Sequence, residues 1–150
     1  MRALIQRVSH ASVTIGDEIK GSIKRGLLLF VGIGHDDEEK DMIWLVSKIL
    51  SMRIFEDDQG KMNLSVKDIE GDILLISQFT LYGSTKKGNR PSFNGSAKPE
   101  KAVPLYNRFH ILLEEELKKT VPSGEFGAQM EINLCNDGPV TIIIDSRERY

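Results

Sequence analysis

Hydrophobic and polar positions in the first third of the chain have the spacing of β-strands. Ala3–Val8 and Ala11–Ile15 are expected to be strands. After the turn signal Gly16-Asp17, the segment Glu18–Ile23 is expected to return as the second arm of a hairpin. Gly26–Ile33 is apolar without interruption, and its length suits a fully buried central strand better than a helix.

Two later segments carry apolar residues at helical spacing. The first is expected to begin at Asp36 or Asp37 as its cap, with Glu39 in capping-box spacing, and to run to about Met52. The second is expected to begin at Pro99. The apolar face comprises Met42, Ile43, Val46, Ile49 and Leu50 in the first helix, and Val103, Tyr106, Phe109, Leu113 and Leu117 in the second.

The middle of the chain combines an apolar strand with a long polar loop. Ile73–Ile76 begins a buried strand, which is expected to continue without a break through Ser77–Tyr82. The following segment, Gly83–Lys98, is polar and rich in glycine. A loop longer than about 12–15 residues in a compact domain is usually functional or disordered.

Two strands, Met130–Asn136 and Val140–Asp145, are expected to close the chain. Asp137-Gly138-Pro139 between them has the residues of a hairpin turn, although a proline at the start of a returning strand also invites a cis peptide bond. Strands outnumber helices and gather at both ends of the chain, which predicts an α+β fold. We expect one compact domain over residues 1–150, with a largely antiparallel, barrel-like sheet and two helices.

Composition and charge narrow the class of protein. With 40% hydrophobic and 28% charged residues among 150, the chain is typical of a soluble globular protein and unlike collagen, a disordered tail or a coiled-coil rod. No stretch approaches the ~18 apolar residues of a membrane span, and Cys135 is the one cysteine, so we expect a cytoplasmic protein. The net charge of −2 argues against a uniformly basic nucleic-acid coat. Residues 73–99 nevertheless hold four bases and no acid, and this is where an anion would be attracted.

Two glycine patterns are similar to nucleotide-binding motifs, and both are incomplete. Gly32-Ile33-Gly34 stands between a strand and a helix, but Asp37 replaces the third glycine of a dinucleotide fingerprint and would repel a pyrophosphate. A plain strand-to-helix turn is therefore favoured. Gly83 and Gly88 have P-loop spacing but are followed by Asn89-Arg90, which excludes ATP hydrolysis by that route. The three histidines are not at ligand spacing, so no metal site is expected.

Two segments are candidates for binding. Ser77-Gln78-Phe79-Thr80 places hydroxyl and amide groups where a buried strand ends, and strand alternation would put Gln78 and Thr80 on one face. The alternative is an ordinary polar strand end. The stretch Lys86–Phe93 offers three cations, backbone amides and an aromatic ring, which suits contacts to phosphate and a stacked base. The alternative there is a solvated surface loop.

Four segments together resemble the D-aminoacyl-tRNA deacylase family. They occur in order and at matching separations over nearly the whole chain, so the likeness is specific although each segment alone is weak. The segments are Met1–Val8, Ser77–Tyr82, Lys86–Phe93, and Phe126–Ala128 through Asn136–Thr141.

The resemblance implies a homodimer that hydrolyses the ester between a D-amino acid and the terminal adenosine of tRNA, without a cofactor. It also implies that backbone amides and polar groups in Ser77, Gln78, Phe79 and Thr80 surround the scissile carbonyl and the adenosine. Because residues 73–99 are basic, we expect Lys86, Lys87 and Arg90 to contact tRNA phosphates.

The resemblance further implies how the two mirror-image substrates are told apart. The bond between Gly138 and Pro139 would be cis and would enter the partner's site, where its carbonyls meet the substrate α-amino group and leave no room for an L side chain. Arg7 would help to fasten this motif. Glycine has no side chain to strike such a wall, so glycyl-tRNA is expected to be hydrolysed to some extent.

An activated ester needs no strong nucleophile, so we expect attack by water aided by the substrate's own 2′-hydroxyl, with Thr80 positioning groups. Two other classes of function stay open. One is a non-catalytic RNA-binding module that uses the stretch Lys86–Phe93, called the basic loop below, and the other is a nucleotide-binding protein that uses Gly32-Ile33-Gly34. Strand alternation is expected to place Ile132 and Leu134 on the inner face and Cys135 on the other. Cys135 has no adjacent base in the sequence and is expected to be an unreactive strand thiol.

Overall fold

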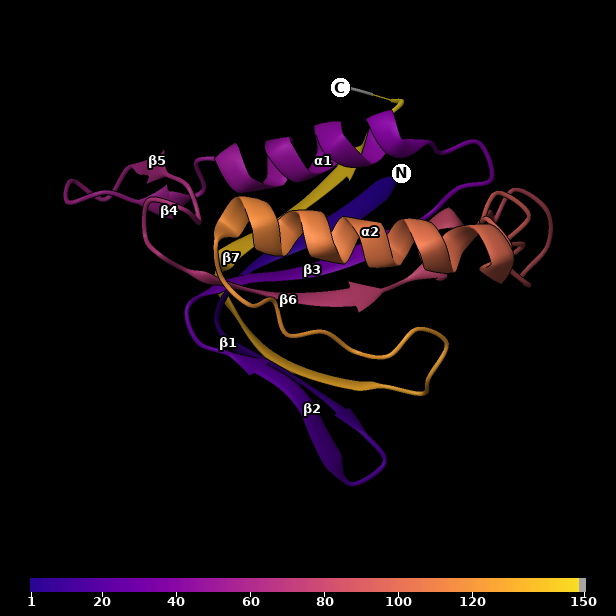
Figure 1. The fold of residues 1–150 in the computed structure, drawn as a ribbon, viewed down its shortest axis with the longest axis horizontal. Coiled ribbons are helices and arrows are strands. Elements are labelled where there is room, and N and C mark those ends of the chain that lie inside the picture. Colours follow the sequence, from indigo (N-terminus) through magenta and orange to yellow (C-terminus); the bar gives the residue numbers. More distant parts are fainter. Residues whose placement is uncertain (149–150) are drawn as a thin grey trace.

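A computed structural model describes residues 1–148. Both helices lie on one face of a curled sheet, and the hairpin at the start of the chain bends away from them (Figure 1). In chain order the elements are β1 (Arg2–Ile15), β2 (Glu18–Ile23), β3 (Gly26–Gly32), α1 (Glu39–Ser51), β4 (Phe55–Glu56), β5 (Met62–Leu64), β6 (Asp72–Ser77), the 3₁₀ turn η1 (Phe79–Tyr82), α2 (Pro99–Leu117) and β7 (Glu131–Asp145).

β1 is the central strand of the main sheet. One side of β1 pairs antiparallel with β7 along almost its whole length. The other side pairs with β3 over residues 2–8 and with β2 over residues 11–15, again antiparallel. β3 then pairs with β6, and this pairing is parallel. The predicted α+β fold with a largely antiparallel sheet and two helices is confirmed.

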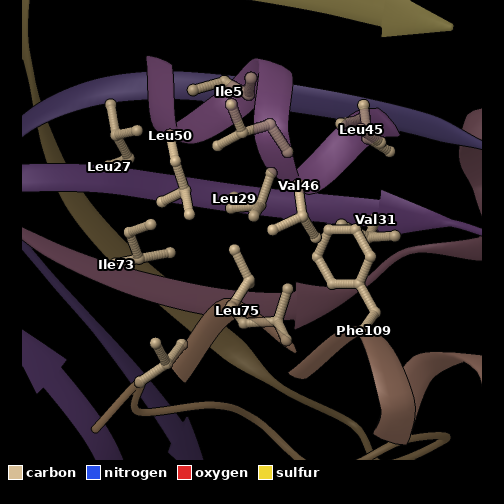
Figure 2. Close-up of a cluster of buried hydrophobic side chains, with 14 of the residues drawn as sticks. Ile5, Leu27, Leu29, Val31, Leu45, Val46, Leu50, Ile73, Leu75 and Phe109 are labelled. Atoms are coloured by element: carbon tan, nitrogen blue, oxygen red, sulfur yellow. The ribbon is translucent and has the colours of Figure 1, made fainter. Parts of the chain in front are cut away.

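The parallel strands β3 and β6 are buried on both faces, which explains their uninterrupted apolar sequences. Alternate residues point toward the helices, among them Leu29 and Leu75, which lie beneath Leu50 of α1 and Phe109 of α2 (Figure 2). The residues between them, such as Leu74, belong to a second apolar cluster on the opposite face.

The second cluster is covered because the sheet curls into a half-barrel. β1 changes partner from β3 to β2 after residue 8, and β2 is carried back toward β6. A Cβ atom on Gly21 of β2 would lie 3.3 Å from the Leu74 side chain of β6, so the two strands approach closely. The barrel-like core expected from the sequence is therefore confirmed.

The ends of the chain differ from the sequence prediction. β1 is one strand where two were expected, and β7 replaces the two closing strands, so the predicted hairpin turn at Asp137-Gly138-Pro139 is wrong. The physical reason is the ladder with β1, which pairs Val8 with Asn136 and resumes with Gln6 opposite Thr141. Residues 137–140 therefore form a bulge within a single strand, where turn-forming residues are also favoured.

The structure corrects three local predictions, which concern the cap of α1, the apolar face of α1 and the inner face of β7. The N-cap of α1 is Glu38, whose N–H donates to Asp41 at 3.0 Å, in place of a cap at Asp36 or Asp37. Ile43 is 52% exposed, and Leu45 is buried in its place. Leu134, which strand alternation placed on the inner face, is 36% exposed. Within residues 1–148, no helix is long and apolar enough to cross a lipid bilayer.

The packing of α2 predicts a sharp difference between two substitutions on that helix. Phe109→Ala removes a fully buried ring and should lower the free energy of unfolding by about 3–5 kcal/mol, because it leaves a cavity. Ile111→Ala, at a side chain that is 46% exposed, should change it by less than about 0.5 kcal/mol. Urea denaturation followed by circular dichroism measures both, and equal losses would contradict the described core.

Candidate active site

A cleft of about 270 Å³ opens where β6 ends. One wall is the carboxyl end of β6 and the residues that follow it, and the other is the segment that leads into β7. The lining residues are Ile76, Ser77, Gln78, Phe79, Phe126, Gly127, Ala128, Gln129, Met130 and Ile132. The structure thus places three of the four predicted catalytic residues, Ser77 to Phe79, in one cleft.

The segment 77–80 does not continue β6 as a strand, which corrects the sequence prediction. The Gln78 N–H still donates to the Val31 carbonyl at 2.8 Å, but the chain then turns into η1. The turn crosses the end of β3 at Gly32, where a Cβ atom would lie 2.8 Å from the Gln78 carbonyl oxygen. A side chain at position 32 would therefore displace η1.

Gln78 and Thr80 nevertheless come together. The Gln78 side-chain amide donates to Thr80 Oγ1 at 2.5 Å, so the turn brings about the convergence that strand alternation was expected to give. Thr80 is exposed and lies beside the cleft lining. No carboxylate or imidazole among residues 1–148 hydrogen-bonds to Thr80 Oγ1, so the described part of this chain supplies the hydroxyl with no general base.

The opposite wall is held by contacts to β6 and α2. Gly124 N–H donates to the Leu75 carbonyl at 3.1 Å, and the segment runs along the free edge of β6 (Figure 1). The Phe126 ring packs edge-on against Tyr106 of α2, with ring centroids 5.8 Å apart. No local pattern in the sequence indicates a site role for residues 126–130. The inclusion of Phe126–Ala128 in the family resemblance was the signal that pointed to them.

Arg7 and Gly138 meet on another part of the molecule. Arg7 is buried, and its guanidinium donates to the carbonyls of Asp137 at 3.1 Å and Ile54 at 2.7 Å. Above it, Gly138 and Pro139 are exposed, and their peptide bond is cis, as the resemblance implied. These three residues do not line the cleft of their own chain.

Backbone hydrogen bonds join the two ends of the basic loop. Ser84 and Ser92 exchange two backbone hydrogen bonds, at 2.8 and 2.9 Å. Phe93 packs edge-on against Phe79, with ring centroids 5.2 Å apart, which ties the loop to the cleft. Lys86, Lys87 and Arg90 are exposed in the loop and do not line the cleft.

The space beside Gly32-Ile33-Gly34, where a dinucleotide phosphate would bind, is filled by other residues of the chain. A Cβ atom on Gly34 would lie 2.8 Å from the Tyr82 hydroxyl oxygen, and the Gly34 N–H donates to the Asp37 carboxylate at 2.7 Å. A phosphate would meet this buried carboxylate in place of a free amide. The geometry supports the strand-to-helix turn that was favoured over a dinucleotide site.

Comparison with known proteins identifies the family. The model of the family described as D-Tyr-tRNA(Tyr) deacylase matches residues 4–145. The chain belongs to this family.

Curated members of the D-Tyr-tRNA(Tyr) deacylase family match along their whole length. A protein of Thermotoga petrophila is 55% identical over 150 residues, which is 100% of both chains, and one of Flavobacterium psychrophilum is 57% identical over 149 residues, which is 99% of each. Both are named D-aminoacyl-tRNA deacylase. The resemblance stated from the sequence is confirmed, and the roles of single site residues stay predictions.

Solved structures share the fold. One titled c-Myc DNA Unwinding Element Binding Protein has a TM-score of 0.92 and 41% identity, and the match covers 97% of this chain and 98% of that one. Another, titled as a probable eukaryotic D-amino acid tRNA deacylase, has a TM-score of 0.83 at 19% identity, with 95% and 97% covered. At that identity the second likeness concerns the fold alone.

The contacts of Arg7 predict that lysine cannot replace it. Arg7→Lys keeps the charge, but a single ammonium cannot reach the carbonyls of Asp137 and Ile54 in the same geometry, so the free energy of unfolding should fall by about 1–3 kcal/mol. Amide exchange at residues 136–140 should also become faster. The control Arg108→Lys, at an exposed ion pair with Glu115, should change neither quantity. A stable Arg7→Lys protein with unchanged exchange would contradict this role.

Proposed function

We propose that this protein hydrolyses the ester that joins a D-amino acid to the 3′-terminal adenosine of tRNA and rejects the L-aminoacyl ester. Membership of the deacylase family supports the class of reaction. The observation that carries the assignment to a site is the cleft lined by Ser77, Gln78 and Phe79, with the basic loop tied to its edge through Phe93.

The chemistry of the site follows from the 3₁₀ turn. The first hydrogen bond of the turn runs from the Leu81 N–H to the Gln78 carbonyl, so the N–H groups of Phe79 and Thr80 precede it. Aimed at the scissile carbonyl, they would stabilise its developing negative charge, and one such donor is worth about 2.7–4 kcal/mol. The activated ester is then attacked by water, aided by the substrate's 2′-hydroxyl.

Thr80 acts in this proposal by position and is not the nucleophile. Its oxygen accepts the Gln78 hydrogen bond, and no base in the described chain is placed to take its proton. The Gln78–Thr80 pair fixes the first residues of the turn and thereby the direction of their N–H groups.

Chiral selectivity requires a rigid group that excludes the L side chain by steric clash, because D and L side chains have the same size and polarity. Ordinary contacts separate such similar ligands by only about 1–3 kcal/mol. Gly138 and Pro139 form a surface projection that the buried Arg7 supports from beneath. In a second copy's cleft, their carbonyls would meet the α-amino group and exclude an L side chain, while glycyl-tRNA would pass.

We propose that Gly138 and Pro139 of a second copy of the chain form this steric barrier. Gly138 and Pro139 lie outside the cleft of their own chain, so a site that contains both the cleft and these residues needs a second chain. Among residues 1–148, β7 pairs with β1 alone, so its other side is a sheet edge, and it exposes Leu134 and Ile143. Long exposed apolar edges are where sheets associate with other chains. The proposed enzyme is therefore a homodimer.

The direct test incubates the purified protein with D-Tyr-tRNA, L-Tyr-tRNA and glycyl-tRNA. The proposal expects release of D-tyrosine and some release of glycine, with L-Tyr-tRNA left intact. Retention of RNA without release would instead indicate an RNA-binding module. Binding of a dinucleotide with no effect of RNA would indicate the nucleotide-binding alternative.

The basic loop predicts a change in the salt dependence of tRNA binding. Replacing Lys86, Lys87 and Arg90 by alanine should weaken binding, and each lost phosphate contact should reduce the slope of log K against log salt by about 0.7–0.9. Lys20, Lys48 and Lys61 replaced together give a control of equal charge in which the loop is intact. An unchanged slope in the loop variant would refute the assignment of the three residues.

The role of Thr80 predicts the behaviour of Thr80→Val. This variant should keep measurable deacylation, because the threonine hydroxyl forms no bond to the substrate. Mass spectrometry of the wild-type enzyme, quenched during turnover, should show no acyl group on Thr80. A D-aminoacyl ester trapped there would overturn the water mechanism.

A further inference from the structure

Arg2 joins the end of β7 to the turn η1. Its Nε donates to the Asp145 carboxylate at 2.8 Å, and its Nη1 donates to the Leu81 carbonyl at 3.1 Å. The guanidinium also lies over the Tyr82 ring, 4.6 Å from its centroid. One side chain thus contacts both the last residue of β7 and the last two residues of the turn.

The turn needs support from outside because it is short. A 3₁₀ turn of four residues has poor internal hydrogen-bond geometry, and its last carbonyls have no partner within it. Arg2 supplies a charged donor to the carbonyl of Leu81, the residue next to Thr80. The contact therefore reaches the turn one residue after Thr80.

Asp145 is a fixed support for Arg2. Burial opposes ionisation of its carboxyl, but hydrogen bonds from Arg2 and from the backbone N–H groups of Arg147 and Glu148 hold its pKa below the usual value. The carboxylate is therefore charged at neutral pH and keeps the guanidinium in a single geometry. It lies at the end of a 15-residue strand that is paired with β1.

On its other side, η1 packs against Gly32 and Gly34. Gly32 and Gly34 leave room for the turn, and the Tyr82 hydroxyl donates to the buried Asp37 at 3.1 Å. Burial and the charge of Asp37 raise the pKa of Tyr82, so this hydroxyl stays a hydrogen-bond donor. The turn therefore lies between Gly32 and Gly34 on one side and the Arg2 guanidinium on the other.

We propose that Arg2 is a positioning residue for the candidate catalytic segment 77–80, which it holds against the sheet through Leu81 and Tyr82. The proposal rests on the deacylase function proposed above. Arg2 does not line the cleft, so it acts through the turn and not on the substrate.

The proposal predicts a split between kinetic constants. Without Arg2, the N–H groups aimed at the scissile carbonyl shift, so kcat should fall by about tenfold to a hundredfold, the loss that a small misplacement causes. KM should change by less than about twofold, because the cleft walls and the basic loop remain. Arg2→Lys can restore the ion pair with Asp145, but one ammonium cannot also serve the Leu81 carbonyl and the Tyr82 ring in the arginine geometry.

The experiment compares Arg2→Ala and Arg2→Lys with the wild type and with Lys119→Ala. The control breaks the ion pair between Lys119 and Asp72 at the opposite end of β6, where Lys119 is 40% exposed against 33% for Arg2, and Asp72 is more exposed than Asp145. Deacylation of D-Tyr-tRNA gives kcat and KM, thermal unfolding gives stability, and NMR hydrogen exchange follows the Leu81 and Gly83 amides, which close the turn.

The proposal expects three results. Exchange at Leu81 and Gly83 becomes faster in both Arg2 variants and not in the control, kcat falls in both, and Arg2→Lys recovers stability without recovering kcat. Unchanged exchange at the two amides, or a kcat that returns in step with stability in Arg2→Lys, would overturn it. If the wild type hydrolyses no D-aminoacyl-tRNA, the proposed function fails, and the exchange rates still decide whether Arg2 holds the turn.

Discussion

The parallel pairing of β3 with β6 is the interaction on which the rest of the molecule depends. Both strands are buried on both faces, so the helices must cover one side and the curled arm of β1 and β2 must cover the other. Between the ends of the pairing β3 and β6 are apolar, and polar side chains follow where the pair ends, with Ser77 and Gln78 in the cleft. Gly32, at the same end of β3, leaves the space in which η1 crosses.

The second constraint is the bulge in the ladder between β1 and β7. Arg7 fills the position opposite residues 137–140, and its buried charge is satisfied by backbone carbonyls and the Asp137 carboxylate. Gly138 therefore projects from a fixed base. The two parts of the proposed site are therefore held in different ways. The cleft forms where the buried strand β6 ends, whereas Gly138 of β7 is supported by the buried Arg7 of the neighbouring strand β1.

Local patterns in the sequence predicted the elements that are stabilised locally. The apolar run of β3 and the helical spacing of α2 indicated the right structures, because burial decides both. The continuity of β7 and the turn η1 depend on distant partners: Asp137-Gly138-Pro139 is turn chemistry used in a bulge, and η1 forms because Gly32 and Arg2 lie beside it. The polar residues of the site were predicted from their place at a strand end, but the opposite wall at Phe126 needed the packing of Tyr106, which no local pattern shows.

We propose that residues 77–80 of one copy and Gly138 of another enclose one substrate. A crystal structure with an unreactive analogue, in which an amide joins D-tyrosine to 3′-amino-3′-deoxyadenosine, tests this most directly. We expect the analogue in the cleft between the end of β6 and Phe126, with its carbonyl oxygen facing the Phe79 and Thr80 amides and its α-amino group against Gly138 of a second chain. An analogue bound outside this cleft, or enclosed by one chain alone, would rule out a substrate site shared between two chains.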